Sequence, residues 1–97
     1  MPDPMAKAVA TVQIDTERVR VTEWRFAPGA HTGHHRHEYA YVVVPMTTGT
    51  LAIRSRDGET MAQLTAGVSY HREAGVEHDV INANPGEFVF IEIELKH

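Results

Sequence analysis

The sequence predicts an all-β fold in which two sheets close into one barrel. Short alternating apolar segments recur between turn residues, and no stretch has the 3.6-residue period of an amphipathic helix. The segments number about eight, which fits a single double-sheet barrel. At 97 residues the chain suits one domain with one core. We therefore predict a single domain over residues 1–97, in which residues 1–7 form a flexible N-terminal segment.

The first half of the chain contains three predicted strands. Residues 8–14 have an extended pattern. Residues 19–26 follow, and their apolar phase shifts partway along, which indicates a β-bulge or cover on both faces. Residues 34–44 form a long β-rich stretch that ends in three valines, 42–44. An apolar run in both phases is typical of a strand buried on both sides.

The second half contains a hairpin and three further strands. Residues 51–53 and 61–64 flank Asp57-Gly58, a turn sequence typical of hairpins. Residues 68–72 and 77–82 then flank a loop that contains glycine. A final strand after residue 86 alternates between an apolar and an acidic face. The apolar face carries Val89, Ile91, Ile93 and Leu95, and the opposite face carries Glu92 and Glu94.

Composition limits the partners that we expect. Nine Lys and Arg against 13 Asp and Glu give a net charge of -4, and the cations are scattered, so no nucleic-acid surface is expected. The chain has no apolar run of membrane-spanning length and no signal-peptide pattern at its start, so we expect a cytoplasmic protein without membrane association. Because cysteine is absent, any metal must be bound by nitrogen and oxygen. The exposed sheet edges of so small a barrel favour a homodimer.

Histidines are concentrated in two short segments. Six of the seven lie at positions 31–37 and 71–78. His35 and His37 are two residues apart, so in an extended strand their imidazoles project from the same face about 6 to 7 Å apart. His78 follows a glycine-containing loop and can supply a third nitrogen if its strand packs beside the first. Three neutral histidines with open positions are typical of a catalytic metal site.

The spacing around these histidines follows two known motifs in order. The first motif, G-x5-H-x-H-x3or4-E-x6-G, is matched at Gly29, His35, His37 and Gly49. Its glutamate is missing, because Tyr41 or Val42 stands at that point of the chain. The second motif, G-x5-P-x-G-x2-H-x3-N, has Glu73 in place of proline. It is matched at Gly67, Gly75, His78 and Asn82.

Through these two motifs the sequence resembles the cupin superfamily, and its histidine segments are also similar to small cupins named as beta-alanine degradation proteins. The resemblance implies a jelly-roll barrel, also called a double-stranded β-helix, with a site in its mouth. It implies a divalent transition metal, Fe, Mn, Ni or Zn, bound by His35, His37 and His78. Without the glutamate the three neutral ligands leave the metal more Lewis-acidic, and this favours an anionic substrate.

Other polar residues near the motifs have simpler alternatives. Tyr41 shares the parity of His35 and His37, so we assign it to substrate binding, although it can equally be a packed strand aromatic. His71 is a second candidate for the substrate pocket, either beside the substrate or hydrogen-bonded to a metal-bound histidine. His31 and His34 are expected in solvated loops. The four motif glycines are expected in turns with positive φ.

Two functions of different classes remain. The first is a metal-dependent enzyme, of oxygenase or isomerase type, that acts on a small anionic metabolite. The second is a non-catalytic module in which the same pocket binds a small ligand or a metal, as in a sensor or an accessory protein. So short a chain offers no obvious lid to exclude water, and this favours the second function.

Overall fold

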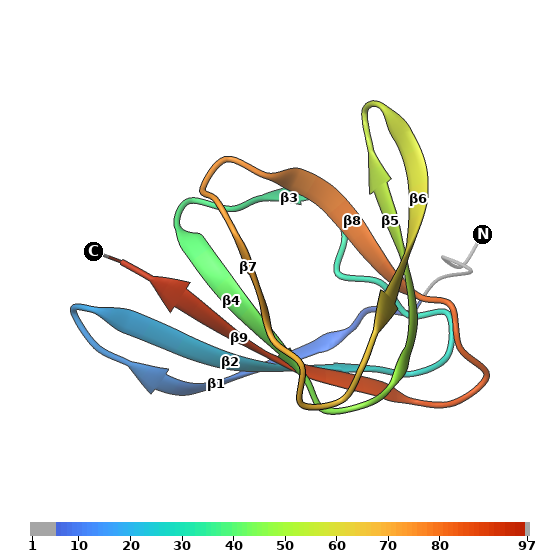
Figure 1. Cartoon of the computed structure of the whole chain (residues 1–97), viewed down its shortest axis with the longest axis horizontal. Coiled ribbons are helices and arrows are strands. Elements are labelled where there is room, and N and C mark those ends of the chain that lie inside the picture. The colour runs from blue at the N-terminus through green and yellow to red at the C-terminus, as the bar shows by residue number, and fades with distance from the viewer. Residues whose placement is uncertain (1–5, 97) are drawn as a thin grey trace.

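The computed structural model describes residues 6–96, and over this range the chain forms nine β-strands in two antiparallel sheets (Figure 1). The prediction of an all-β, double-sheet barrel is confirmed. No helix long and apolar enough to cross a membrane is found among these residues. The strands are β1 (Val9–Asp15), β2 (Val19–Phe26), β3 (His35–Arg36), β4 (Ala40–Pro45), β5 (Gly49–Ser55), β6 (Gly58–Leu64), β7 (Tyr70–Arg72), β8 (Glu77–Asn82) and β9 (Phe88–Leu95).

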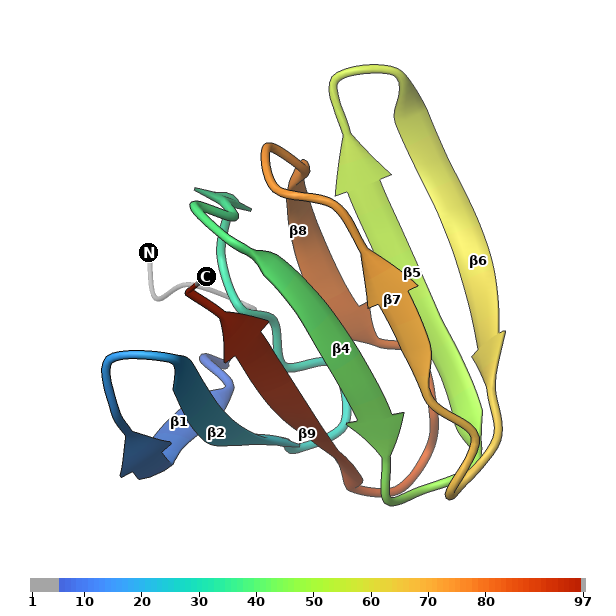
Figure 2. The same cartoon turned by 60° about the vertical axis from the view of Figure 1, so that its left-hand side comes forward.

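The two sheets differ in size and lie face to face (Figure 2). The large sheet has the strand order β1-β2-β9-β4-β7, and the small sheet has the order β3-β8-β5-β6. The β5–β6 hairpin turns at Asp57-Gly58, as predicted, and Gly58 has a positive φ of 120°. Of the predicted flexible segment, residues 1–5 lie outside the described residues. Residue Ala6 accepts a hydrogen bond from the His31 amide at 2.9 Å, and Lys7 forms a β-bridge with His31.

The predicted long strand over residues 34–44 is wrong, because the chain changes sheets within it. β3 belongs to the small sheet and β4 to the large one. Between them His37 leaves the ladder: its amide donates to Val76 O at 2.8 Å, and its carbonyl accepts from Gly75 N at 2.8 Å. Val42 and Val44 are partly exposed and only Val43 is buried, so the strand is not covered on both sides.

The phase shift in residues 19–26 also has a different cause from a bulge in that strand. β2 pairs with β9 without interruption, and the irregularity lies in β1, between Val12 and Ile14. Alternation in β2 directs Phe26 into the core, where it is 0% exposed, and directs Val19 and Val21 to the outside of the large sheet. The apolar valines of β2 therefore lie on the outer face of the barrel.

The core fills one end of the space between the sheets. Phe26, Phe88 and Leu51 are almost fully buried and come from β2, β9 and β5. Burying an aromatic or leucine side chain stabilises the fold by about 1.5–3 kcal/mol. Val43 and Phe90 belong to the core cluster and also form the wall of a cavity at the other end. The core therefore supplies a packed floor beneath that cavity.

Candidate metal centre

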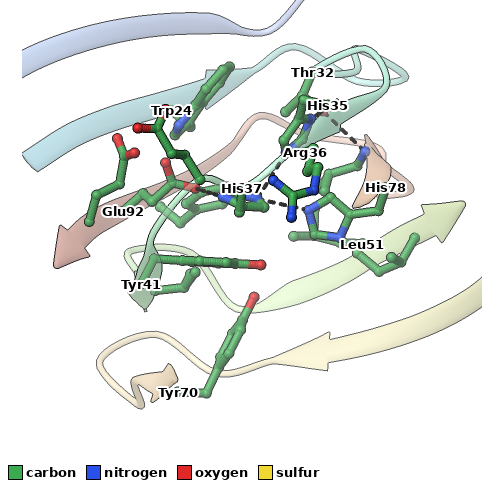
Figure 3. Close-up of a pocket in the computed structure, with 16 residues that line it drawn as sticks. Trp24, Thr32, His35, Arg36, His37, Tyr41, Leu51, Tyr70, His78 and Glu92 are labelled. Carbon is green, nitrogen blue, oxygen red and sulfur yellow. Dashed lines mark hydrogen bonds and ion pairs between the residues drawn. The ribbon is translucent and has the colours of Figure 1, made fainter. Parts of the chain in front are cut away.

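A cavity of about 300 Å³ opens between the two sheets (Figure 3). Its floor is apolar and contains Leu51 and Phe90, whereas its upper part is polar. Pockets that bind small ligands are typically apolar and carry a few convergent polar groups, and this volume lies at the lower end of their range. The polar groups include three histidines, His35, His37 and His78.

Each of the three histidines reaches the cavity from a different position. His35 in β3 is the direct register partner of His78 in β8, so the two side chains leave adjacent strands on one face. His37 follows β3 and is held by the loop at residues 75–76. His37 Nε2 lies 3.0 Å from His35 Nε2 and 3.1 Å from His78 Nε2. The spacing of two residues therefore brings His35 and His37 together, as predicted, and β-pairing adds His78.

The imidazole of His35 is oriented by the loop before it. Its Nδ1 lies 2.8 Å from Gly33 O, and because a carbonyl only accepts, Nδ1 carries the proton. In the neutral ring Nε2 then holds a lone pair directed at the cluster. The loop itself is held by Asp79, which accepts from Gly33 N at 3.0 Å and contacts His31 Nδ1 at 3.0 Å. A carboxylate therefore supports the ligand through the backbone.

Hydrogen bonding alone does not satisfy the three ring nitrogens. His35 Nε2 is an acceptor, so His37 Nε2 must donate to it, and the same single proton would also have to serve His78 Nε2. A neutral imidazole has only one such proton at that nitrogen. A bound cation, in contrast, takes a lone pair from each ring. The donor set therefore fits a metal ion better than a network of hydrogen bonds.

Burial keeps these imidazoles in the form that binds metals. Desolvation, with smaller contributions from neighbouring histidines, lowers the pKa of His37 to about 3. The pKa of His78 is lowered to about 4, mainly by burial and then by the charge of His35, while Asp79 opposes the shift. Both rings are therefore neutral at physiological pH, and neutral imidazole is the metal-binding state.

Two of the three nitrogen separations match those of ligands on a single ion. Two nitrogens bound at right angles, each about 2.1 Å from a metal, lie about 3.0 Å apart, whereas tetrahedral ligands lie about 3.4 Å apart. The Nε2 atom of His37 lies 3.0 and 3.1 Å from those of His35 and His78, and both distances match the first value. All three ligand atoms lie within 4.8 Å of one another. His35, His37 and His78 therefore form a candidate site for one metal ion.

Comparison with known proteins now identifies the fold family. A model of the cupin domain matches residues 22–94. The chain belongs to the cupin family. It is 59% identical, over 93% of its length and 95% of the relative, to the beta-alanine degradation protein BauB of Pseudomonas aeruginosa. A crystal structure of a cupin domain from Bordetella pertussis Tohama I is 59% identical, with a TM-score of 0.96 over 98% of this chain and 99% of that one.

More distant structures share only the fold. The polyketide cyclase RemF from Streptomyces resistomycificus is 17% identical, with a TM-score of 0.72 over 98% of this chain and 71% of that chain. The double-stranded β-helix predicted from the two motifs is confirmed by these comparisons and by the strand order.

Tyr41 lies against the histidines of the cupin site. Its ring stacks on His37 with centroids 3.8 Å apart and an interplanar angle of 20°. The residue is 3% exposed and lines the cavity, as does Tyr70 from β7. Burial raises the pKa of Tyr41 above its usual range, so its hydroxyl stays protonated and is available as a hydrogen-bond donor. Of the two residues at the point where the cupin motif has its glutamate, Tyr41 is the one that lines the cavity.

A buried carboxylate that motif spacing did not reveal lies on the far side of His37. Glu92 in β9 is 8% exposed, and its Oε2 is 4.0 Å from His37 Nδ1 (Figure 3). Burial, together with the charge of Glu94, raises the pKa of Glu92 to about 7, and Trp24 and Arg20 oppose this shift. The carboxyl group of Glu92 thus faces Nδ1 of His37 and not Nε2, at a distance longer than a hydrogen bond.

The sequence contained a signal for Glu92 that spacing from the histidines missed. Glu92 has the same parity in β9 as Phe88 and Phe90, which are both buried. A strand face that begins with two large aromatics and continues with carboxylates indicates an inward face whose far end is polar. Cavity acids are thus predicted from alternation along the strand.

The structure does not bring His71 to the cavity. It is the register partner of Val42, on the outer face of the large sheet, and its side chain is 49% exposed, 4.0 Å from Glu73. Its neighbour Tyr70 lines the cavity instead. His34 is exposed, 3.6 Å from Glu77, as expected for a loop residue. His31, however, is partly buried and contacts Asp79, so its assignment to a solvated loop is wrong.

Asn82, the last residue of the second motif, is structural. It is 2% exposed, and its Nδ2 donates to Phe26 O, Ala27 O and Gly86 O at 2.9–3.2 Å. It thereby joins the end of β2 to the loop between β8 and β9.

Proposed function

We propose that this cupin is a metal-dependent enzyme that acts on a small anionic metabolite, through an oxygenation or an isomerisation. The observation that carries the proposal is the convergence of three imidazole nitrogens, from His35, His37 and His78, in a cavity with an apolar floor. When bound, a divalent Fe, Mn, Ni or Zn ion supplies Lewis acidity and, for a redox metal, electron transfer.

The residues around the triad have separate roles in this proposal. The Gly33 carbonyl fixes the tautomer of His35, and the carboxyl group of Glu92 faces Nδ1 of His37. The protonated hydroxyl of Tyr41 donates to an oxygen of the bound metabolite. Arg36 lines the same cavity and supplies a positive charge at its edge. A cavity of about 300 Å³ suits a metabolite of a few carbon atoms.

The identity of the metabolite class is supported by the relative at 59% identity. That protein is named for beta-alanine degradation. We therefore propose that the substrate of this chain is a three-carbon carboxylate that is related to β-alanine. Such a molecule is small enough for the cavity, and its carboxylate complements a site whose three ligands are uncharged.

A second candidate, a non-catalytic module for a small ligand or a metal, is favoured by the openness of the site. A neighbouring cleft between β6 and β7 shares Tyr41, Tyr70 and His78 with the cavity. His78 of the triad therefore borders two pockets, whereas oxygen-activating sites usually exclude water. A sensor or accessory protein has no such requirement.

Two measurements separate these functions. Elemental analysis of protein purified without a nickel column should give close to one transition metal per chain, and much less for His35→Ala, with His71→Ala as the matched control. Oxygen uptake is then followed with β-alanine and related three-carbon acids. Isomerisation is followed in the same mixtures by NMR. Turnover that His35→Ala abolishes supports the enzyme, whereas stoichiometric metal with neither reaction supports the binding module. Equal metal in both variants contradicts the triad as its ligand set.

A further inference from the structure

The two sheets contribute side chains of opposite charge to the triad cavity. Arg36, in β3 of the small sheet, is the one cation among the described residues that line it. Glu92 and Glu94 line it from β9 of the large sheet. Glu38, between β3 and β4, also lines the cavity and is exposed. The carboxyl groups therefore outnumber the cations, and the wall formed by β9 is complementary to a positively charged group of a ligand.

Glu92 is the carboxyl group on this wall that has no cation partner within the described chain. Glu94 pairs with Arg20, its register partner in β2, at 3.2 Å. Glu92 is 8% exposed, and its neighbour at 4.0 Å is His37, whose ring is neutral because burial lowers its pKa to about 3. Trp24 lies close enough to lower the pKa of Glu92, but its Nε1 makes no hydrogen bond. Buried polar groups are usually hydrogen-bonded, so an unpartnered carboxyl group in the wall of a cavity indicates a ligand group.

Aromatic rings flank Glu92 on both neighbouring strands. In β2, Trp24 pairs with Phe90, which places it diagonal to Glu92 on the inner face of the sheet. In β4, Tyr41 pairs with Glu94 and is diagonal to Glu92 on the other side. Trp24, Tyr41 and Glu92 all line the cavity (Figure 3). Aromatic faces attract cations, and indole does so most strongly, so rings beside a carboxyl group are typical of a site for an ammonium group.

The wall formed by the small sheet suits a carboxylate. Arg36 forms no ion pair with a described residue, whereas Arg20 and Arg54 each contact a glutamate. It lies in the same sheet as His35 and His78. A guanidinium group with unused donors is a strong partner for a carboxylate. A ligand that spans the cavity therefore meets an arginine at one end and a carboxyl group at the other.

We propose that the cavity binds an amino acid as a zwitterion, with the ammonium group between Glu92 and Trp24 and the carboxylate on the side of Arg36. This inference rests on the proposed function, because it retains the three-carbon carboxylate and adds an amino group at the opposite end of the molecule. β-Alanine has this arrangement of charges, and a cavity of about 300 Å³ is large enough for it. Glu92 is then the residue that determines specificity, since a ligand of the same length without an amino group leaves it buried and unpaired.

The test is calorimetric titration of the full chain in the presence of Zn²⁺, which has no redox chemistry. It compares β-alanine with 3-hydroxypropionate, in which a hydroxyl replaces the ammonium group. Wild type should bind β-alanine at least ~10-fold more tightly, because the hydroxy acid lacks the charge-assisted hydrogen bond to Glu92. Glu92→Gln should reduce this ratio to less than ~3-fold. Glu38→Gln is the matched control, because Glu38 lines the same cavity but is exposed, and it should keep the wild-type ratio.

The ratio of the two affinities separates ligand binding from a structural role of Glu92. A structural effect of Glu92→Gln, transmitted through His37, lowers both affinities alike and leaves the ratio unchanged. A second measurement uses wild type alone and therefore covers a variant that does not fold. Trp24 is the only tryptophan of the chain, so its fluorescence reports on the wall beside Glu92. Saturation with β-alanine should change this emission, because indole emission responds to a charge placed against the ring.

The outcomes distinguish the ammonium site from the proposed function. Equal affinities of wild type for the two acids, or a preference that Glu92→Gln retains, overturns the zwitterion proposal and leaves the carboxylate site standing. Bound β-alanine that does not change the emission of Trp24 also overturns it. A chain that binds neither acid overturns the proposed substrate class, and the ammonium site with it.

Discussion

Acid should destabilise the metal-free protein through two cavity histidines. The pKa values of His37 and His78 are about 3 and about 4 in the folded chain, whereas the unfolded chain protonates histidine near pH 6.5. Below that pH the unfolded state binds more protons than the folded state, so the free energy of unfolding falls as the pH is lowered. Between pH 6.5 and 4.5, each histidine should lower this free energy by about 2.3 kcal/mol.

Glu92 acts with the opposite sign over the same range. Its folded pKa of about 7 lies above the ordinary value of 4.5, so the folded state takes up a proton before the unfolded state does. Acidification from pH 6.5 to 4.5 should therefore raise the contribution of Glu92 to the free energy of unfolding by about 2 kcal/mol. From these three groups the wild-type chain loses about 2.5 kcal/mol, whereas Glu92→Gln, which has no proton to gain, loses about 4.6 kcal/mol.

The assay is urea unfolding of wild type and Glu92→Gln at both pH values, with a chelator present. The difference between the two proteins isolates Glu92, because all other carboxylates titrate alike in both. Glu59→Gln, at an exposed glutamate that pairs with Arg54 at 2.7 Å, is the matched control and should behave as wild type does. Parallel pH dependences for wild type and Glu92→Gln would refute the assignment of Glu92 as a buried, proton-accepting group.

Three further substitutions test individual contacts. Asp79→Asn removes the charge that holds the loop before His35 and should weaken zinc binding by about tenfold in a competition assay; unchanged affinity would show that the loop holds itself. Gly49→Ala places a Cβ 2.5 Å from Asn84 Oδ1 and should lower the free energy of unfolding by about 1–3 kcal/mol, with Gly86→Ala, which has open space, as the control. Asn82→Leu removes the side-chain donor shared by three carbonyls and should lower the free energy of unfolding by at least about 3 kcal/mol. A loss below about 1 kcal/mol would contradict the bonds assigned to it.

The fold was predictable because its signals are local. Alternation and turn residues located β2 and β8 at their observed bounds, and they located the turn of the β5–β6 hairpin at Asp57-Gly58. The change of sheet after β3 was not predictable, because it depends on hydrogen bonds from His37 to a loop near residue 75, far away in the sequence. Tertiary contacts of this kind override a continuous β-pattern.

The candidate site was predictable only in part, for a related reason. Residues His35 and His37 are close in sequence, and motif spacing added His78, which the structure pairs with His35. The position of Glu92 in the cavity and that of His71 on the outer face depend on which side of each strand faces inward. Motif spacing does not contain that information. For Gly49 the expected positive φ is wrong. Glycine fits this position for a different reason, because Asn84 leaves no room for a side chain.

The central claim is that three imidazoles bind one metal ion in the barrel cavity. The most direct measurement is an anomalous difference map from crystals of the chain grown with Zn²⁺ or Mn²⁺. We predict one peak per chain, about 2.1 Å from the Nε2 atoms of His35, His37 and His78. A peak at another location, or a triad without a peak in metal-saturated crystals at neutral pH, would contradict the claim.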